Sequence, residues 1–270
     1  MPNRHSTRES SVLLLQLTDS HLFAEADGTL LGMNTADSLR QVVERVMAEQ
    51  PTVDLMIATG DLSQDGTLAS YERFREMTAC IDAPHHWMAG NHDEAAVMAE
   101  HYGGSELMRQ VVDIGNWRIT MLDSSVSGSV PGWLAEDQLQ TLEASLQGAP
   151  DRHHLVCLHH HPVSIDCKWM EPIGLRNAEA FLAVIDRYPQ VRAVLWGHIH
   201  QQLERERNGV RLLASPSTCV QFKPLSEDFS LDRIAPGYRW LRLNPNGQLD
   251  TGISRVPGFE FAAEFGGSGY

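Results

Sequence analysis

The sequence predicts an α/β fold in which two mixed β-sheets pack together and helices cover their outer faces. Two observations lead to this prediction. Apolar runs of strand length alternate with segments whose apolar residues recur at helical spacing. Hairpin signals, among them Asn208-Gly209 and Asn246-Gly247, add antiparallel strands to this alternation. Strand–helix alternation favours parallel pairing, so each sheet is expected to be mixed.

The first part of the chain alternates regularly between strands and helices. Short apolar runs that end in polar or glycine residues predict the buried strands. Between these runs, apolar side chains recur every three or four residues, which predicts helices with one apolar face. We expect strands at 12–17, 55–58 and 86–88, with helices around 39–47 and 71–77.

Antiparallel pairing enters at residue 111. Two apolar segments flank Gly115-Asn116, which is the pattern of a hairpin. Strand–helix alternation then resumes, and the two Asn-Gly turns predict that the last third is again antiparallel. We expect a hairpin of 111–114 with 117–122, helices around 139–146 and 180–185, and strands at 155–158 and 191–196.

Neither an internal repeat nor a linker divides the 270 residues. A chain of this length is compatible with one large domain. We therefore expect a single domain over 1–270, with a core of about 12–256 and a mobile glycine-rich tail at 266–270.

Five predicted strands end in short polar signatures. In open α/β sheets, ligands bind beyond the carboxyl ends of the strands. Each signature alone is compatible with an ordinary loop, but five of them behind five strands predict a shared site. The signatures are Asp19-Ser20-His21, Gly60-Asp61, Gly90-Asn91-His92-Asp93, His159-His160-His161-Pro162 and Gly197-His198-Ile199-His200.

These signatures contain seven potential metal ligands. Carboxylate, amide and imidazole groups without a thiolate suit manganese, iron or zinc. Seven ligands are too many for one ion, but they suit two ions that share a carboxylate. Two ions about 3.5–4 Å apart are a known device for hydrolysing phosphate esters. The seven candidates are Asp19, His21, Asp61, Asn91, His159, His198 and His200.

The triple histidine cannot direct all its side chains at one ion from an extended segment. His159 is nearest the end of the predicted strand, so it is the preferred ligand. His160 is left as either a supporting or a substrate-facing residue, and His161 as structural.

The bulk composition limits the partners. Lys and Arg total 21 against 35 Asp and Glu, and the net charge of −14 opposes binding to a nucleic-acid backbone. Four dispersed cysteines without a Cys-x-x-Cys pair are typical of a reducing compartment. The polar segment 1–11 lacks the pattern of a signal peptide, and no run approaches the roughly 20 apolar residues of a membrane span. We expect a cytoplasmic protein with a small-molecule substrate, and neither a membrane nor a nucleic acid as partner.

The order of the five signatures resembles the calcineurin-like metallophosphoesterase superfamily over about residues 12–220. Within that region, 60–66, 197–201 and 216–224 look like the bacterial class III cyclic-AMP phosphodiesterases. The resemblance implies a four-layer αββα sandwich with Asp61 bridging two ions. It places Asp19, His21 and His200 on one ion, and Asn91, His159 and His198 on the other. His92 is then a catalytic residue that faces the substrate without binding metal.

The resemblance also implies a reaction. A hydroxide shared by the two ions would attack 3′,5′-cyclic AMP, His92 would protonate the departing 3′-oxygen, and the product would be 5′-AMP. Asp61 is expected to act in catalysis with His92, and Phe222 is placed to contact the base. The residues expected to contact substrate are His21, Asp61, Asn91, His92 and His200.

Three alternatives are compared with this reaction. Protein phosphatases of the superfamily typically carry an arginine just after the Gly-Asp signature, and the segment 62–66 has none, which favours a diester substrate. A glycerophosphodiesterase, or another small-molecule phosphodiesterase of the same superfamily, is the main alternative. A scaffold without catalysis is disfavoured because every expected site position is filled.

Overall fold

The computed structural model describes residues 10–260, and its first sheet has five strands. β1, β4 and β5 are parallel to one another, whereas β14 and β15 form an antiparallel hairpin that joins the sheet through β1. The sheet is therefore mixed, as the sequence predicts. Its order is β15 (Leu249–Arg255), β14 (Gly237–Leu243), β1 (Val12–Leu17), β4 (Leu55–Thr59) and β5 (His85–Met88).

The second sheet has six strands and is also mixed. The parallel strands are β7, β8, β9 and β11, and antiparallel β6 and β10 lie at the edges. β10 and β11 form the predicted hairpin at Asn208-Gly209, but β11 runs parallel to β9. The prediction that the last third is antiparallel is therefore wrong for the pairing of β11 with β9, whereas β10 with β11 and β14 with β15 are antiparallel. The order is β10 (Leu203–Arg207), β11 (Val210–Ala214), β9 (Val191–Trp196), β8 (His153–Cys157), β7 (Trp117–Met121) and β6 (Val111–Ile114).

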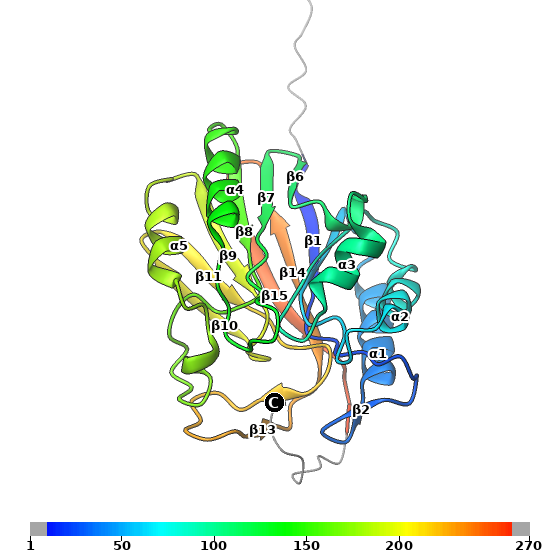
Figure 1. Ribbon diagram of the computed structural model, residues 1–270. Coiled ribbons are helices and arrows are strands. Elements are labelled where there is room, and N and C mark those ends of the chain that lie inside the picture. The colour runs from blue at the N-terminus through cyan, green and yellow to red at the C-terminus, as the bar shows by residue number, and fades with distance from the viewer. Residues whose placement is uncertain (1–9, 261–270) are drawn as a thin grey trace, which may run out of the picture.

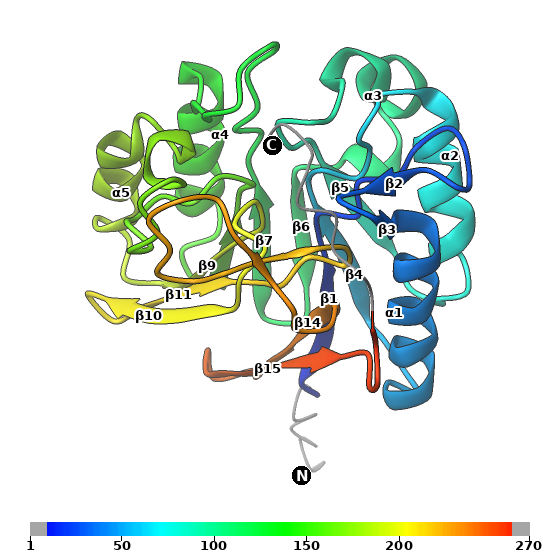
Figure 2. The ribbon, with the colours of Figure 1, turned by 90° about the horizontal axis from the view of Figure 1, so that it is seen from below.

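Helices cover the outer face of each sheet, as Figures 1 and 2 show. α1 (Thr35–Glu49), α2 (Leu68–Thr78) and α3 (Ala95–Tyr102) pack on the first sheet. α4 (Glu136–Gln147) and α5 (Ala178–Ile185) pack on the second. The remaining elements are short: 3₁₀ turns η1 (Glu106–Met108) and η2 (Glu171–Ile173), and strands β2 (Thr29–Leu30), β3 (Met33–Asn34), β12 (Gln221–Phe222) and β13 (Leu231–Asp232).

Local chemistry explains where the first two helices begin. The side chain of Asn34 accepts a hydrogen bond from the Asp37 N–H at 2.7 Å and so caps α1. Thr67 caps α2 by accepting from the N–H of Ser70 at 3.3 Å. The spacing of Leu39, Val42, Val43, Val46 and Met47 predicts one apolar face on α1. The structure buries the first four, but Met47 is 48% exposed, so the prediction is wrong for Met47.

Three apolar layers hold the molecule together. Side chains alternate along β1: Val12 and Leu14 contact the layer between the two sheets, whereas Leu15 and Leu17 contact the layer beneath α1 and α2. A third layer lies between the second sheet and its helices. The four-layer αββα sandwich is thereby confirmed.

Two further sequence predictions concern the C-terminal tail and membrane-spanning segments. The predicted tail at 266–270 lies outside the described residues. Within 10–260, no helix combines the length and apolarity needed to cross a membrane.

Candidate metal centre

The five polar signatures meet at one edge of the sandwich, and all seven predicted ligands lie there. Strands β1, β4 and β5 of the first sheet end just before four of these ligands, and β8 and β9 of the second sheet end just before the other three. Every ligand except the half-buried Asn91 is fully buried. From the first sheet come Asp19, His21, Asp61 and Asn91, and from the second come His159, His198 and His200.

Asp19, His21 and His200 form one cluster, in which one ligand atom of each lies within 4.8 Å of the others. The Nε2 atom of His200 is 3.1 Å from Nε2 of His21 and 3.4 Å from a carboxylate oxygen of Asp19. Asp19 also contacts the backbone of the other sheet. Its two carboxylate oxygens both accept from the N–H of His198, at 3.0 and 3.1 Å. Asp19 thus ties the end of β1 to the end of β9.

The second cluster surrounds His159. Its Nε2 atom lies 3.2 Å from Oδ1 of Asn91 and 3.2 Å from Oδ2 of Asp61. That same Asp61 oxygen is 3.8 Å from Nε2 of His21, so it lies between the two clusters. His198 belongs to the same cluster, because one of its ring nitrogens lies within 4.8 Å of a ring nitrogen of His159. The arrangement places Asp61 where a carboxylate shared by two ions would be required.

Outer hydrogen bonds determine which nitrogen of each histidine faces the site. The partners are oxygen atoms that only accept: Gln64 Oε1 for His21 at 2.6 Å, and the Thr59 carbonyl for His159 at 2.7 Å. His200 Nδ1 donates to the Val220 carbonyl at 2.8 Å, and His198 Nε2 to that of Ile173 at 3.0 Å. A neutral ring that donates outward keeps a lone pair on its other nitrogen. All four rings therefore direct a lone pair inward.

This inward set of lone pairs fits divalent cations. When the rings are neutral, the facing nitrogens of His21 and His200, and the facing His159 nitrogen and Asn91 oxygen, repel one another unless a proton or a metal cation lies between them. Within residues 10–260, the buried Asp61 Oδ2 and His198 Nδ1 have no hydrogen-bond partner. Buried polar atoms normally have one, so these two atoms mark positions for an ion. The donor set suits borderline or hard ions.

The surroundings change the pKa values of these groups in opposite directions. Burial lowers the pKa of His21 to about 3, and it lowers that of His198 well below its usual value. Burial also acts against the charged form of His159, but the carboxylate of Asp61 outweighs it and raises the pKa of His159 to about 9. A cation between His159 and Asp61 would take the place of that proton.

The backbone at the site is unusual. Five of the seven ligands have positive φ values: Asp19 (56°), His21 (48°), Asp61 (51°), His198 (65°) and His200 (48°). Non-glycine residues adopt this conformation at a cost, and it concentrates at functional sites. Close packing adds a further constraint, because a Cβ atom at Gly90 would overlap the carboxylate of Asp61. The turns after the strands are thus shaped to bring the ligands together.

Gln64 is a site residue that ligand patterns alone did not identify. Its Oε1 accepts from Nδ1 of His21 at 2.6 Å, and its Nε2 donates to Nδ1 of His92 at 3.2 Å. One side-chain amide therefore sets the proton positions of two rings, leaving His21 a lone pair and His92 a proton on Nε2. The only signal in the sequence is its place three residues after Asp61.

Asp93 also supports the site without joining the ligand clusters. Its carboxylate accepts from the N–H groups of Gly90, Ser63 and Leu62 at 2.8, 3.0 and 3.2 Å. Burial and the negative charge of Asp61 raise the pKa of Asp93 to about 7, against these three donors. The bonds join the turn after β4 to the turn after β5.

The structure distinguishes the three adjacent histidines. His160 lies within 4.8 Å of His159 and His198, but both of its ring nitrogens are hydrogen-bonded, to Ser124 Oγ at 2.8 Å and to the Val130 carbonyl at 2.9 Å. Both nitrogens are therefore occupied by protein groups, and the ring is fully buried. His161 stacks on His198 with 5.6 Å between ring centroids. His159 alone of the three directs a nitrogen at Asp61.

The segment 216–224 reaches the site, as expected from the sequence, but Phe222 does not face it. Ser217 Oγ donates to the Asp19 carbonyl at 2.6 Å, which brings the segment against the ligands. Phe222 is fully buried and stacks on His200 with 4.3 Å between centroids. The expected contact between Phe222 and a base is therefore wrong: its ring supports a ligand from behind.

The fold and the ligand geometry define a metallophosphoesterase-like molecule, and comparison with known families agrees. The calcineurin-like phosphoesterase model matches residues 12–202. The chain belongs to this family. A crystal structure of a dimetal phosphatase from Danio rerio has the same fold, with a TM-score of 0.63 at 17% identity, covering 92% of this chain and all of that one.

Two curated relatives are more specific. A protein of Pseudomonas aeruginosa named 3′,5′-cyclic adenosine monophosphate phosphodiesterase CpdA is 56% identical over 99% of this chain and 100% of its own length. The Escherichia coli K12 protein of the same name is 44% identical over 97% of this chain and 96% of its own length.

Proposed function

We propose that this protein is a dinuclear-metal phosphodiesterase that hydrolyses 3′,5′-cyclic AMP to 5′-AMP. The observation that carries the proposal is the 56% identity, across almost the whole chain, to a protein named for that activity. The site supports it independently, because all seven expected ligand positions are filled and converge. A scaffold without catalysis does not require such a complete set.

The ligands are assigned to two ions. Asp61 is shared, as the position of its Oδ2 atom between His21 and His159 supports. When bound, iron, manganese or zinc would supply an activated hydroxide and positive charge for the phosphate oxygens. We assign Asp19, His21 and His200 to one ion, and Asn91, His159 and His198 to the other.

We assign direct roles on the substrate to two side chains. Gln64 donates to Nδ1 of His92, which keeps the His92 proton on Nε2, and this proton is assigned to the departing 3′-oxygen. Asn91 has its oxygen toward His159, and its buried Nδ2 has no hydrogen-bond partner among residues 10–260. That amide is therefore available to donate to a phosphate oxygen. The residues proposed to line the phosphate position are His21, Asp61, Asn91, His92 and His200.

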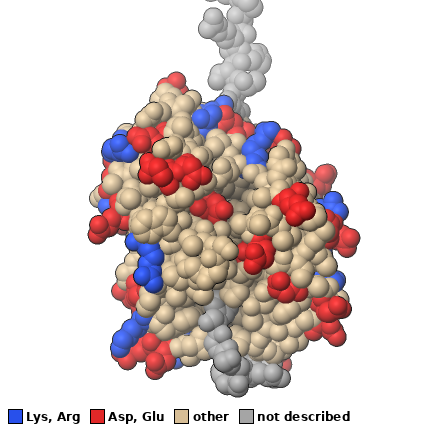
Figure 3. Space-filling view, viewed as in Figure 1, with Lys and Arg blue, Asp and Glu red and all other residues tan. Residues whose placement is uncertain are grey.

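Charge supports a small diester. The segment 62–66 contains no arginine that could bind the extra charge of a phosphate monoester. On the face shown in Figure 3, basic side chains are scattered among more numerous acidic ones, which is unfavourable for a long polyanion. All four cysteines are free thiols, which fits our proposal that the protein acts in the reducing cytoplasm.

Product analysis tests the proposal. Full-length protein reconstituted with manganese or iron is incubated with cyclic AMP, and the products are separated by chromatography. We expect 5′-AMP. Brisk cleavage of glycerophosphodiesters without 5′-AMP from cyclic AMP would overturn the substrate and favour a glycerophosphodiesterase. Formation of 3′-AMP would keep the substrate but overturn the proposed leaving group.

A further inference from the structure

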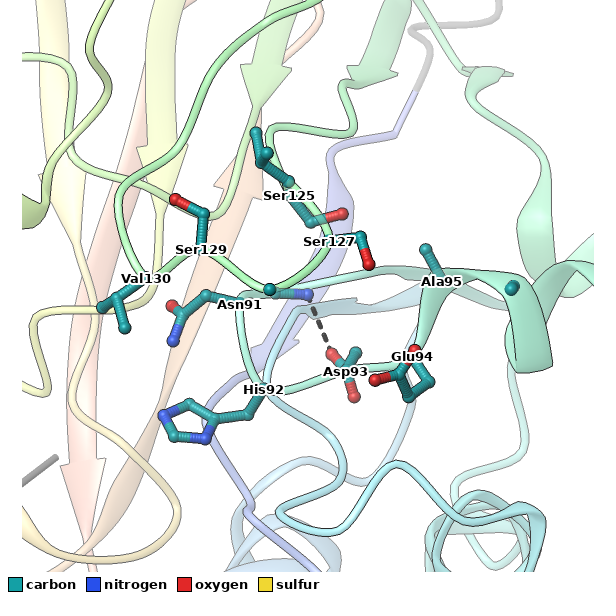
Figure 4. A pocket seen from close by; sticks show the side chains of 13 residues that line it. Asn91, His92, Asp93, Glu94, Ala95, Ser125, Ser127, Ser129 and Val130 are labelled. Atoms are coloured by element: carbon teal, nitrogen blue, oxygen red, sulfur yellow. Dashed lines mark hydrogen bonds between the residues drawn. The ribbon is translucent and has the colours of Figure 1, made fainter.

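A cavity of about 290 Å³ lies beside His92. It has two walls, and only one of them contains a ligand signature. Residues 90–96 line one side and residues 125–130 line the other. Figure 4 shows Ser125, Ser127, Ser129 and Val130 across from Asn91 and His92. The volume is near the lower end of the roughly 300–1,000 Å³ of small-molecule sites, so it suits one small organic group.

The second wall is held in place by His160, the neighbour of ligand His159. Ser124 Oγ lies 2.8 Å from His160 Nδ1, and His160 Nε2 lies 2.9 Å from the Val130 carbonyl. The carbonyl only accepts, so Nε2 is the donor and the Ser124 hydroxyl donates to Nδ1. Both ends of the segment are thus fixed to the strand end that carries a ligand, while its tip at Val126 is 38% exposed. A tight turn closes the tip, with the N–H of Ser129 donating to the Val126 carbonyl at 2.9 Å.

The lining favours an uncharged polar group. It contains the carboxylates of Asp93 and Glu94 but neither lysine nor arginine, so a second phosphate is disfavoured here. The hydroxyls of Ser125 and Ser129 donate to Asp123 and to the Pro131 carbonyl, which leaves their oxygens able to accept. The hydroxyl of Ser127 forms no hydrogen bond to another residue within 10–260, and in Figure 4 it points toward the segment of Asp93 and Ala95.

We propose that the segment 125–130, called the serine loop, binds the nucleoside of a cyclic nucleotide whose phosphodiester lies at the metal centre. The inference rests on the proposed function and adds a place for the sugar and base. His92 lines the cavity and carries the proton assigned to the leaving oxygen, so the ribose that keeps this oxygen enters the cavity beside it. The serine hydroxyls and Glu94 then supply hydrogen bonds to the nucleoside, and Ser127 is the serine whose hydroxyl has no competing bond.

The test compares a nucleotide with a diester that lacks a nucleoside. Full-length protein reconstituted with manganese is assayed with cyclic AMP and with bis(p-nitrophenyl) phosphate. Ser127→Ala should raise KM for cyclic AMP about three- to tenfold, the effect of one lost hydrogen bond, with a smaller change for the aryl diester. Ser127→Trp, which fills the cavity, should raise KM for cyclic AMP further. Metal content and melting temperature should stay near wild type in both.

A matched control is Ser105→Ala, an exposed serine outside this cavity, which should leave both substrates at wild-type values. If wild type cleaves cyclic AMP but both Ser127 variants keep its KM within twofold, the serine loop does not bind the nucleoside and the inference is overturned. Equal losses for the two substrates would also overturn it, because they would indicate a general effect on the site. A wild-type protein that cleaves the aryl diester but not cyclic AMP would instead overturn the proposed function.

Discussion

The seven candidate metal ligands and the serine loop meet at Asn91, the one candidate ligand that lines the cavity, but the molecule holds them in different ways. The ligands follow directly from strand ends, are almost all fully buried, and are fixed through left-handed backbone and outer hydrogen bonds. The serine loop is an exposed turn that is held near its two ends, where His160 bonds to Ser124 and to the Val130 carbonyl. The difference predicts two tasks: a rigid centre for the chemistry, and a more exposed wall for the substrate that is joined to this centre through His160.

The largest expected effect tests the rigid centre. Asp61→Ala should abolish activity and lower the metal content at both positions, because its Oδ2 atom lies between His21 and His159. Elemental analysis of the purified variant measures the ions per chain. Asp65→Ala is a matched control, since this exposed carboxylate four residues later belongs to neither cluster and should retain metal. Two ions retained in Asp61→Ala would contradict the assignment.

His92→Ala should separate chemistry from metal binding. Turnover of cyclic AMP should fall about 100-fold or more, in the range for a lost general acid, while metal content stays near wild type. A p-nitrophenolate leaving group needs little protonation, so bis(p-nitrophenyl) phosphate should be affected less. Loss of metal in this variant would make His92 a ligand and the present assignment wrong.

Substitutions of Gln64 should have an intermediate effect on activity. Two of them distinguish its hydrogen bond to His21 from its hydrogen bond to His92. Gln64→Glu keeps an acceptor for His21 but removes the donor to His92, so turnover of cyclic AMP should fall with metal affinity largely retained. Gln64→Leu removes both bonds and should lower activity and metal affinity by about tenfold or more, as is usual for partners of metal ligands. Metal titration beside steady-state kinetics measures both quantities. Equal behaviour of the two variants would show that Gln64 does not act through separate bonds.

The smallest effect tests the attachment of the serine loop. Ser124→Ala removes the hydrogen bond to His160 Nδ1 and should cost about 1–2 kcal/mol of unfolding free energy, because the group is buried. KM for cyclic AMP should rise a few-fold while kcat and metal content remain near wild type. Denaturant unfolding and kinetics check the two parts. A fall in kcat as large as that of His92→Ala would show that the attachment of the loop controls the chemistry and not only the binding of cyclic AMP.

The elements that could be predicted are those whose own residues and immediate neighbours in the sequence indicate them. Strands β1 and β9 agree with the predicted residues at both ends, because their apolar runs are bounded by polar signatures. The seven candidate ligands come from the same signatures, and the structure brings them together at one edge of the sandwich. α3 was not predicted, since Ala95–Tyr102 has apolar residues on several sides and no clear periodicity. The parallel pairing of β11 with β9 also has no local signal.

The role of His160 was left open between two alternatives, and that of Gln64 was missed, for a different physical reason. The role of His160 depends on Ser124, which is 36 residues away in the chain, and the amide of Gln64 acts on a ring 28 residues away. Such contacts exist only after the sandwich has formed, whereas a ligand at a strand end is visible from its immediate neighbours. Phe222 illustrates the converse: its position near the site was predicted, but its burial behind His200 depends on packing.

The division of the ligands between two sheets has a consequence for folding thermodynamics. Asp19, His21, Asp61 and Asn91 follow strands of one sheet, and His159, His198 and His200 follow strands of the other. Ions held by this set bind only a chain in which both sheets are already joined. By mass action, each tenfold excess of free ion over its Kd then adds about 1.4 kcal/mol to the stability of the whole sandwich. The proposed catalytic ions therefore act also as a reversible cross-link between the two halves of the fold.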